Sequence, residues 1–263
     1  MLIMCTLIIN RSLNSKWSCI IGANRDEYFE RPTKGPGNHW KQFPNVYAGM
    51  DVTKGGSWLG INKSGLFAAI LNRKTENIND TTRQSRGHIV INALSFQKLQ
   101  NSLDYIKEID SNNFNPFNLI LGDYKSTYWI KNENSKRIEL HTLPSGFSMI
   151  DGYNLNDINS PKYKYNIENI RKASTPSPEN NNWNSWIDIL SINHNEKDNL
   201  SKDINVHDKQ SNYGTRSSSL LALPNKSKKT QMLTNPIWLY CDGFPLKKNF
   251  KKLELDKFYN WYK

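Results

Sequence analysis

The sequence predicts an α+β protein, and three features of the chain support that class. Short apolar segments separated by polar turns open the chain, as in antiparallel strands. Segments with helical spacing of apolar residues follow in blocks, and strand-like segments then return. This order favours layered antiparallel sheets over an alternation of parallel strands and helices. We expect a single domain over residues 1–263, because no linker divides the chain.

Two β-hairpins are expected in the first part of the chain. Residues 5–9 and 17–23 are short and apolar, with a polar segment between them. Residues 56–61 and 66–71 flank a four-residue polar turn that ends in Gly65, a residue suited to a tight turn.

Serines mark the expected starts of two helices. Ser95 is the predicted N-cap of the first, and Ser160 with Pro161 opens the second, through about residue 171. The first helix is expected to carry Phe96, Leu99, Leu103 and Ile106 on one face, and a terminal helix to carry Phe250, Leu253, Phe258 and Trp261. The other expected elements are strands at 117–121, 127–131, 137–143, 217–223 and 232–240, a helix at 183–192 and a loop at 193–212.

Composition argues against several functional classes. The net charge is +11, but the basic residues are spread along the chain apart from one cluster, Lys247, Lys248, Lys251 and Lys252. We therefore expect small anionic or apolar ligands and no nucleic acid. No apolar run reaches the roughly 18 residues of a membrane helix, so no integral membrane segment is expected.

The cysteines indicate the cellular compartment. Cys5, Cys19 and Cys241 are an odd number and have no metal-ligand spacing. They predict neither a disulfide scaffold nor a metal site, and they favour a reducing, cytoplasmic location. An association with mitochondria would fit a eukaryotic source.

The densest polar cluster is Asn24-Arg25-Asp26-Glu27, directly after the apolar strand that is predicted to end at Ala23. Four hydrogen-bonding side chains at a strand end could share a site. The alternative is a solvated turn with an Arg–carboxylate pair, which contributes little when exposed.

Five segments in order give the chain a resemblance to a known family. They are Met4-Cys5-Thr6-Leu7, the run from Ala23 to Glu27 with Arg31-Pro32, Ala48-Gly49 through Gly55-Gly56-Ser57-Trp58-Leu59-Gly60, Phe117-Asn118-Leu119-Ile120, and Tyr213-Gly214-Thr215-Arg216-Ser217-Ser218. The chain resembles the NRDE family, which is named for transport and Golgi organisation protein two. The resemblance implies an N-terminal nucleophile hydrolase-like fold, in which helices sandwich two antiparallel sheets.

For function, the resemblance implies intracellular haem trafficking, and it also points to lipid and acyl-coenzyme A metabolism. A haem carrier needs an apolar cleft and cations for the propionates. The residues assigned to these tasks are Arg25, Trp58, Arg73, Arg86 and Arg216. Haem would be exchangeable, since no Cys-x-x-Cys-His motif is present, and would pass to haem-accepting proteins.

The alternative is a cysteine amidohydrolase, since the chain also resembles the bile-salt and penicillin amidases. Cys5 would attack an amide carbonyl, with its own α-amine as base. Arg25 would favour the thiolate, Asp26 would orient the amine or Arg25, and Asn24 would donate to the oxyanion. Arg216 would bind a substrate carboxylate. This mechanism requires Cys5 to become N-terminal, since four residues precede it.

Overall fold

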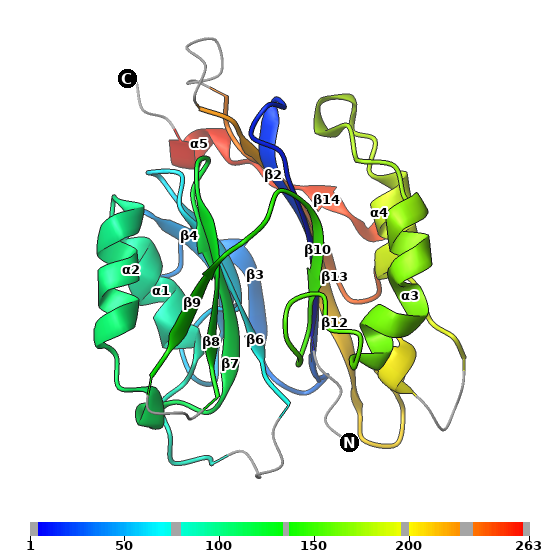
Figure 1. Ribbon diagram of the computed structural model, residues 1–263, viewed down its shortest axis with the longest axis horizontal. Coiled ribbons are helices and arrows are strands. Elements are labelled where there is room, and N and C mark those ends of the chain that lie inside the picture. Colours follow the sequence, from blue (N-terminus) through cyan, green and yellow to red (C-terminus); the bar gives the residue numbers. More distant parts are fainter. Residues whose placement is uncertain (1–4, 75–79, 134–136, 196–199, 227–233, 260–263) are drawn as a thin grey trace. The chain divides into compact units, whose positions relative to one another are not determined.

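The computed structural model describes residues 5–74, 80–133, 137–195, 200–226 and 234–259. The chain forms two compact units, one made of Met1–Glu30 with Pro144–Lys263 and the other of Arg31–Leu143. Each unit is an antiparallel sheet that carries helices, which confirms the α+β class (Figure 1). The single-domain assignment stays a prediction. Within the described ranges, none of the helices is both long enough and apolar enough to cross a membrane.

The first unit is built on a seven-stranded sheet in which the order is β10-β1-β2-β12-β13-β14, with β11 paired to β12. These strands are β1 (Thr6–Arg11), β2 (Trp17–Tyr28), β10 (Gly146–Ile150), β11 (His207–Asp208), β12 (Tyr213–Pro224), β13 (Ile237–Asp242) and β14 (Lys251–Lys252). The long strands β2 and β12 form its centre, so residues from the two ends of the chain lie side by side.

Helices α3 (Pro161–Lys172) and α4 (Asn184–Leu190) belong to this unit (Figure 1). The Ser160 side chain accepts a hydrogen bond from the Tyr163 main-chain N–H at 3.1 Å, which confirms the predicted N-cap. The buried residues Trp186 of α4 and Ile170 of α3 join Ile8 of β1 in one apolar cluster. This core holds the two helices against the sheet.

The second unit is a seven-stranded meander whose order follows the sequence. Its strands are β3 (Thr33–Gly37), β4 (Val46–Asp51), β5 (Leu59–Asn62), β6 (Phe67–Asn72), β7 (Phe117–Gly122), β8 (Thr127–Asn132) and β9 (Glu139–Thr142). Helices α1 (Gly87–Ser95) and α2 (Leu99–Glu108) share an apolar core with alternate sheet residues such as Ala68 and Leu119. Asn62 ties β5 to the end of α1 by donating to the Leu94 carbonyl at 2.8 Å.

Both predicted β-hairpins are confirmed. Strands β1 and β2 form the first predicted hairpin, and β5 and β6 form the second, with Gly65 at a φ of +89°. Strands β7, β8 and β9 also match predicted strands.

Two helix predictions were wrong in position. Ser95 is the last residue of α1, and α2 begins only at Leu99, because residues 87–95, which bury apolar side chains at 89–91, 93 and 94, form a helix of their own. In the predicted terminal helix, Lys251–Lys252 is strand β14 and only Asp256–Tyr259 is helical. Trp261 and residues 232 and 233 lie outside the described residues. No sequence pattern had predicted strands β3, β4, β10 and β11.

Candidate functional site

The Asn24-Arg25-Asp26-Glu27 run lies inside strand β2 and not after it, which corrects the predicted strand end at Ala23. The strand continues to Tyr28 because β12 pairs with it over this whole region. Side chains alternate between the two faces of a strand. Asn24 and Asp26 therefore lie on one face of the sheet, and Arg25 and Glu27 lie on the other.

Asn24 connects its strand to three other segments. Its amide nitrogen donates to the carbonyls of Leu190 and Ile204, both at 2.9 Å, and its amide oxygen accepts from the Ser218 hydroxyl at 2.7 Å. The side chain is buried, so each of these bonds satisfies a group that water cannot reach. The structure therefore gives Asn24 a clear anchoring role, and its role as an oxyanion donor stays a prediction.

We expect Asn24→Ala to destabilise the protein by about 3 kcal/mol, because it leaves two buried carbonyls and one hydroxyl without this partner. Urea unfolding followed by tryptophan fluorescence measures the loss. Asn10→Ala is the matched control in the same sheet, since Asn10 donates only to the exposed Thr175 hydroxyl. A variant as stable as the Asn10 control would contradict the anchoring role.

Asp26 lies at the centre of a buried polar cluster. Its carboxylate accepts from the Lys162 ammonium at 3.1 Å and from the Thr215 hydroxyl at 2.8 Å. The same ammonium donates to the Thr6 hydroxyl at 3.0 Å. Burial raises the pKa of Asp26, while the charge of Lys162 lowers it. The cluster joins β1, β2 and β12 to the first turn of α3.

Cys5 directly precedes β1 and contacts the main chain of Asp26. The Asp26 N–H donates to Sγ at 3.3 Å, and Sγ donates to the Asp26 carbonyl at 3.6 Å. The residue is partly exposed, unlike Cys19 and Cys241, which are 1% and 0% exposed. Burial of the thiol, with a further contribution from the Asp26 charge, raises the pKa of Cys5 to about 11. Cys5 is therefore a neutral thiol at pH 7.

The pKa of Cys5 predicts how its alkylation depends on pH. The iodoacetamide rate should rise about tenfold per pH unit from pH 7 to 10, because only the thiolate reacts. The rate should level off near the Cys5 pKa of about 11. A plateau near pH 8.5, the value of an unperturbed thiol, would contradict this environment.

Arg25 and Arg216 lie near Tyr240 of β13. The Arg25 guanidinium lies 3.5 Å from the Glu27 carboxylate, and the Arg216 guanidinium contacts the Asp242 carboxylate at 2.6 Å. Arg216 is the extra residue of a β-bulge in β12, a feature that redirects a side chain. Burial raises the pKa of Tyr240, and the charges of Arg216 and Arg25 lower it. Both cations therefore act on one hydroxyl.

Several members of this site had not been predicted from the sequence. Lys162, Thr6, Thr215 and Tyr213, whose hydroxyl donates to the Asp26 carbonyl at 3.0 Å, were not assigned. Thr215 lies within the Tyr213–Ser218 segment that carries part of the family resemblance, and that segment was the signal that could have identified it. Lys162 follows a helix cap, and no local pattern distinguishes it from a surface lysine.

The residues assigned to haem fall in both units. Arg25 and Arg216 are in the first unit, whereas Trp58, Arg73 and Arg86 are in the second. Arg73 is buried, donates to the Asn118 amide oxygen at 2.7 Å and pairs with Glu133. Arg86 donates to the Pro116 carbonyl at 2.9 Å, and the Trp58 ring lies against Gly49. The haem assignment stays a prediction.

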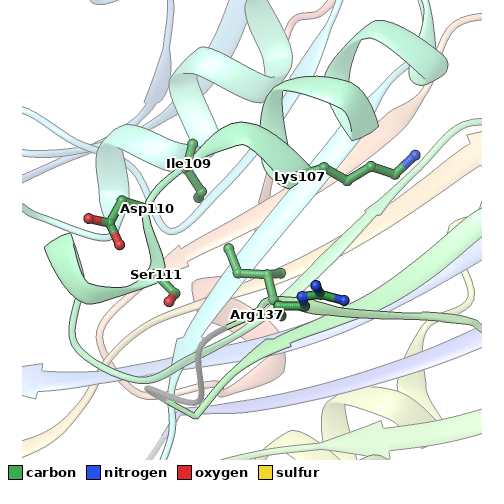
Figure 2. Close-up of a pocket in the computed structure, with 6 residues that line it drawn as sticks. Lys107, Ile109, Asp110, Ser111 and Arg137 are labelled. Carbon is green, nitrogen blue, oxygen red and sulfur yellow. The ribbon is translucent and has the colours of Figure 1, made fainter.

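A pocket of about 320 Å³ lies in the second unit. Its lining residues are Lys107, Ile109, Asp110, Ser111, Arg137 and Ile138. Figure 2 shows Lys107 and Arg137 extending in the same direction, away from Asp110. The lining of this pocket includes no cysteine, and the pocket belongs to a different unit from Cys5. No group of three or more His, Cys, Asp and Glu side chains suited to a metal ion occurs in the described part of the chain.

Comparison with solved structures shows the fold of N-terminal nucleophile hydrolases. A Caenorhabditis elegans ortholog of N-acylethanolamine-hydrolyzing acid amidase matches 86% of this chain and 95% of its own, with a TM-score of 0.57 and 13% identity. A variant of conjugated bile acid hydrolase from Clostridium perfringens matches 96% of this chain and 93% of its own, with a TM-score of 0.52 and 12% identity. This confirms the predicted fold class.

Comparison of sequences shows the family. A Bos taurus homolog of Transport and Golgi organization protein 2 is 35% identical over 109 residues. That match covers 40% of this chain and only 38% of the bovine protein. The family model for Transport and Golgi organisation 2 matches residues 4–234, which is most of the chain. The chain therefore belongs to the Transport and Golgi organisation 2 family.

Proposed function

We propose that this protein is a cysteine-dependent amidohydrolase in which Cys5 is the nucleophile. One observation carries the proposal: Cys5 is a half-buried residue directly before β1, and its thiol is held by the main chain of Asp26, whose carboxylate is fixed by Lys162 and Thr215. Two proteins named as hydrolases share this fold, which supports hydrolysis as the reaction.

The high pKa of Cys5 requires a base beside the thiol. If Cys5 begins the chain, its α-amine takes the thiol proton, and Sγ forms a bond to the amide carbonyl carbon. The C–N bond then breaks, and the leaving nitrogen takes the proton from the α-ammonium. Water hydrolyses the thioester, which releases a carboxylic acid and restores the thiol. The positive charge of Arg25 favours the thiolate.

The direct test compares two starting points of the same chain. A chain produced from Met followed by Cys5 should lose its initiator and hydrolyse N-acyl 4-nitroanilides with short or long acyl groups. The 263-residue chain should be inactive until residues 1–4 are removed, because its Cys5 nitrogen is an amide and not a base. Equal turnover by the two chains, or none by either, would overturn the proposal.

The haem expectation makes a separate demand that uses the same chain. A carrier should bind haem reversibly, and Cys5→Ala should leave this binding intact. Absorbance titration of haem into the 263-residue chain and into the Cys5→Ala variant measures it. Reversible saturation by both chains would support carriage, whereas no saturable binding would remove it.

A further inference from the structure

The buried Lys162–Asp26 ion pair lies directly beside the Cys5 thiol, although the two residues belong to different segments. The Lys162 side chain is 4% exposed and the Asp26 side chain is 0% exposed. Burial of two opposite charges is costly unless further hydrogen bonds satisfy them. Thr6 and Thr215 supply such bonds, at 3.0 and 2.8 Å. The pair is therefore a built feature of the site.

Residue 26 links this pair to the thiol. Its carboxylate binds Lys162 and Thr215, while its own N–H and carbonyl bind the Sγ of Cys5. The Tyr213 hydroxyl holds the same carbonyl at 3.0 Å. Because both ends of the residue are fixed, movement of the carboxylate would also move the main chain that contacts the thiol.

We propose that Lys162 is a positioning residue for Cys5, which acts by holding the Asp26 carboxylate in place and neutralising its charge beside the thiol. The role of Cys5 in hydrolysis rests on the proposed function, whereas the effect of Lys162 on the acidity of the thiol does not. Sequence motifs gave no reason to select this lysine from the 35 Lys and Arg residues of the chain.

The charges around Cys5 fix the sign of each expected effect. Asp26 and Arg25 come from β2, Lys162 from α3, and the Tyr213 hydroxyl from β12. After burial, the Asp26 charge raises the pKa of Cys5, whereas the charges of Arg25 and Lys162 lower it. Loss of the cation should make the thiol less acidic, and loss of the anion should make it more acidic.

The experiment measures alkylation of Cys5 by iodoacetamide from pH 7 to 10 in the 263-residue chain. Trypsin separates the three thiols, because Cys5, Cys19 and Cys241 fall in peptides 1–11, 17–25 and 230–247. Mass spectrometry of these peptides gives one rate for each thiol. Protection of the buried Cys19 reports that a variant is folded.

Lys162→Met should slow Cys5 alkylation by about threefold or more, which corresponds to half a pKa unit, and Asp26→Asn should accelerate it by a similar factor. Lys162→Arg keeps the cation and should restore most of the rate. Lys172→Met is the control on the same helix, because its side chain is 79% exposed.

Slower alkylation of Cys5 in Lys162→Met together with faster alkylation in Asp26→Asn distinguishes this role from a structural one. A structural loss would expose the thiol and accelerate alkylation in both. Acceleration by Lys162→Met, or an unchanged rate, with Cys19 still protected would overturn the proposal. If that variant does not fold, an unchanged or slower rate in Asp26→Asn, with Cys19 still protected, also overturns the proposal. Absence of hydrolysis by every chain would contradict the proposed function and leave these signs as they are.

Discussion

Cys5→Ala is expected to abolish amide hydrolysis by the chain that begins at residue 5, with a loss of at least about a thousandfold in kcat. The substitution removes the atom that forms the covalent bond, and no other described thiol replaces it, since Cys19 and Cys241 are buried. The loss is measured as the rate of 4-nitroaniline release from the N-acyl 4-nitroanilides, followed by absorbance.

Two further variants make this result specific. Cys241→Ala removes a buried thiol whose pKa is also raised to about 11, and it should keep full activity. Cys5→Ser keeps a hydroxyl at the same position and should retain only residual turnover, because a hydroxyl is harder to ionise than a thiol. Undiminished hydrolysis by Cys5→Ala would show that the reaction does not pass through this thiol.

Lys162→Met is expected to destabilise the protein by about 3–5 kcal/mol, because removing one partner leaves a buried carboxylate without its counter-ion. The neighbouring hydroxyls of Thr6 and Thr215 cannot replace a full positive charge. Urea unfolding measures the loss, and Lys172→Met on the same helix should change stability by less than about 1 kcal/mol.

This loss should depend on pH in a defined direction. The folded pKa of Asp26 lies above its unfolded value, so the folded state holds the proton more tightly. Asp26 therefore favours folding below the unfolded pKa and loses that contribution as the pH rises. We expect the defect of Lys162→Met to be smaller at pH 5 than at pH 8.

The double variant Asp26→Leu with Lys162→Met provides the control for this interpretation. Replacement of a whole buried pair by apolar side chains is often neutral, so the double variant should recover at least half of the lost stability. Additive losses from the two substitutions would show that the two side chains are not coupled, and would contradict the buried ion pair.

Local chemistry explains which parts of the fold could be predicted. The turn that ends in Gly65 and the cap at Ser160 depend on residues close in sequence, and both were found. The length of β2 depends on β12, whose partner residues lie about two hundred positions later, as in the pair of Asn24 and Ser218. Without that pairing, the polar run after Ala23 looked like a turn.

In the candidate site, too, the residues within recognisable sequence motifs could be predicted, whereas a contact between distant residues could not. The run of Asn24, Arg25 and Asp26 stood out in the sequence itself, and the family resemblance added Cys5 and Arg216. The structure places all five residues in the first unit. It brings Cys5 to Asp26 directly, whereas Asn24 binds the end of α4 at Leu190 and the Ile204 carbonyl. Lys162 could not be foreseen, because its contact with Asp26 spans 136 residues of sequence.

The measurement that decides whether Cys5 works with its own α-amine is an intact mass. The protein is expressed without an N-terminal tag, and the mass is taken on a fraction that hydrolyses an N-acyl 4-nitroanilide. The predicted mass is that of a chain that begins at Cys5, because only that chain has a base beside a thiol of pKa about 11. An active fraction that retains residues 1–4 would contradict the mechanism.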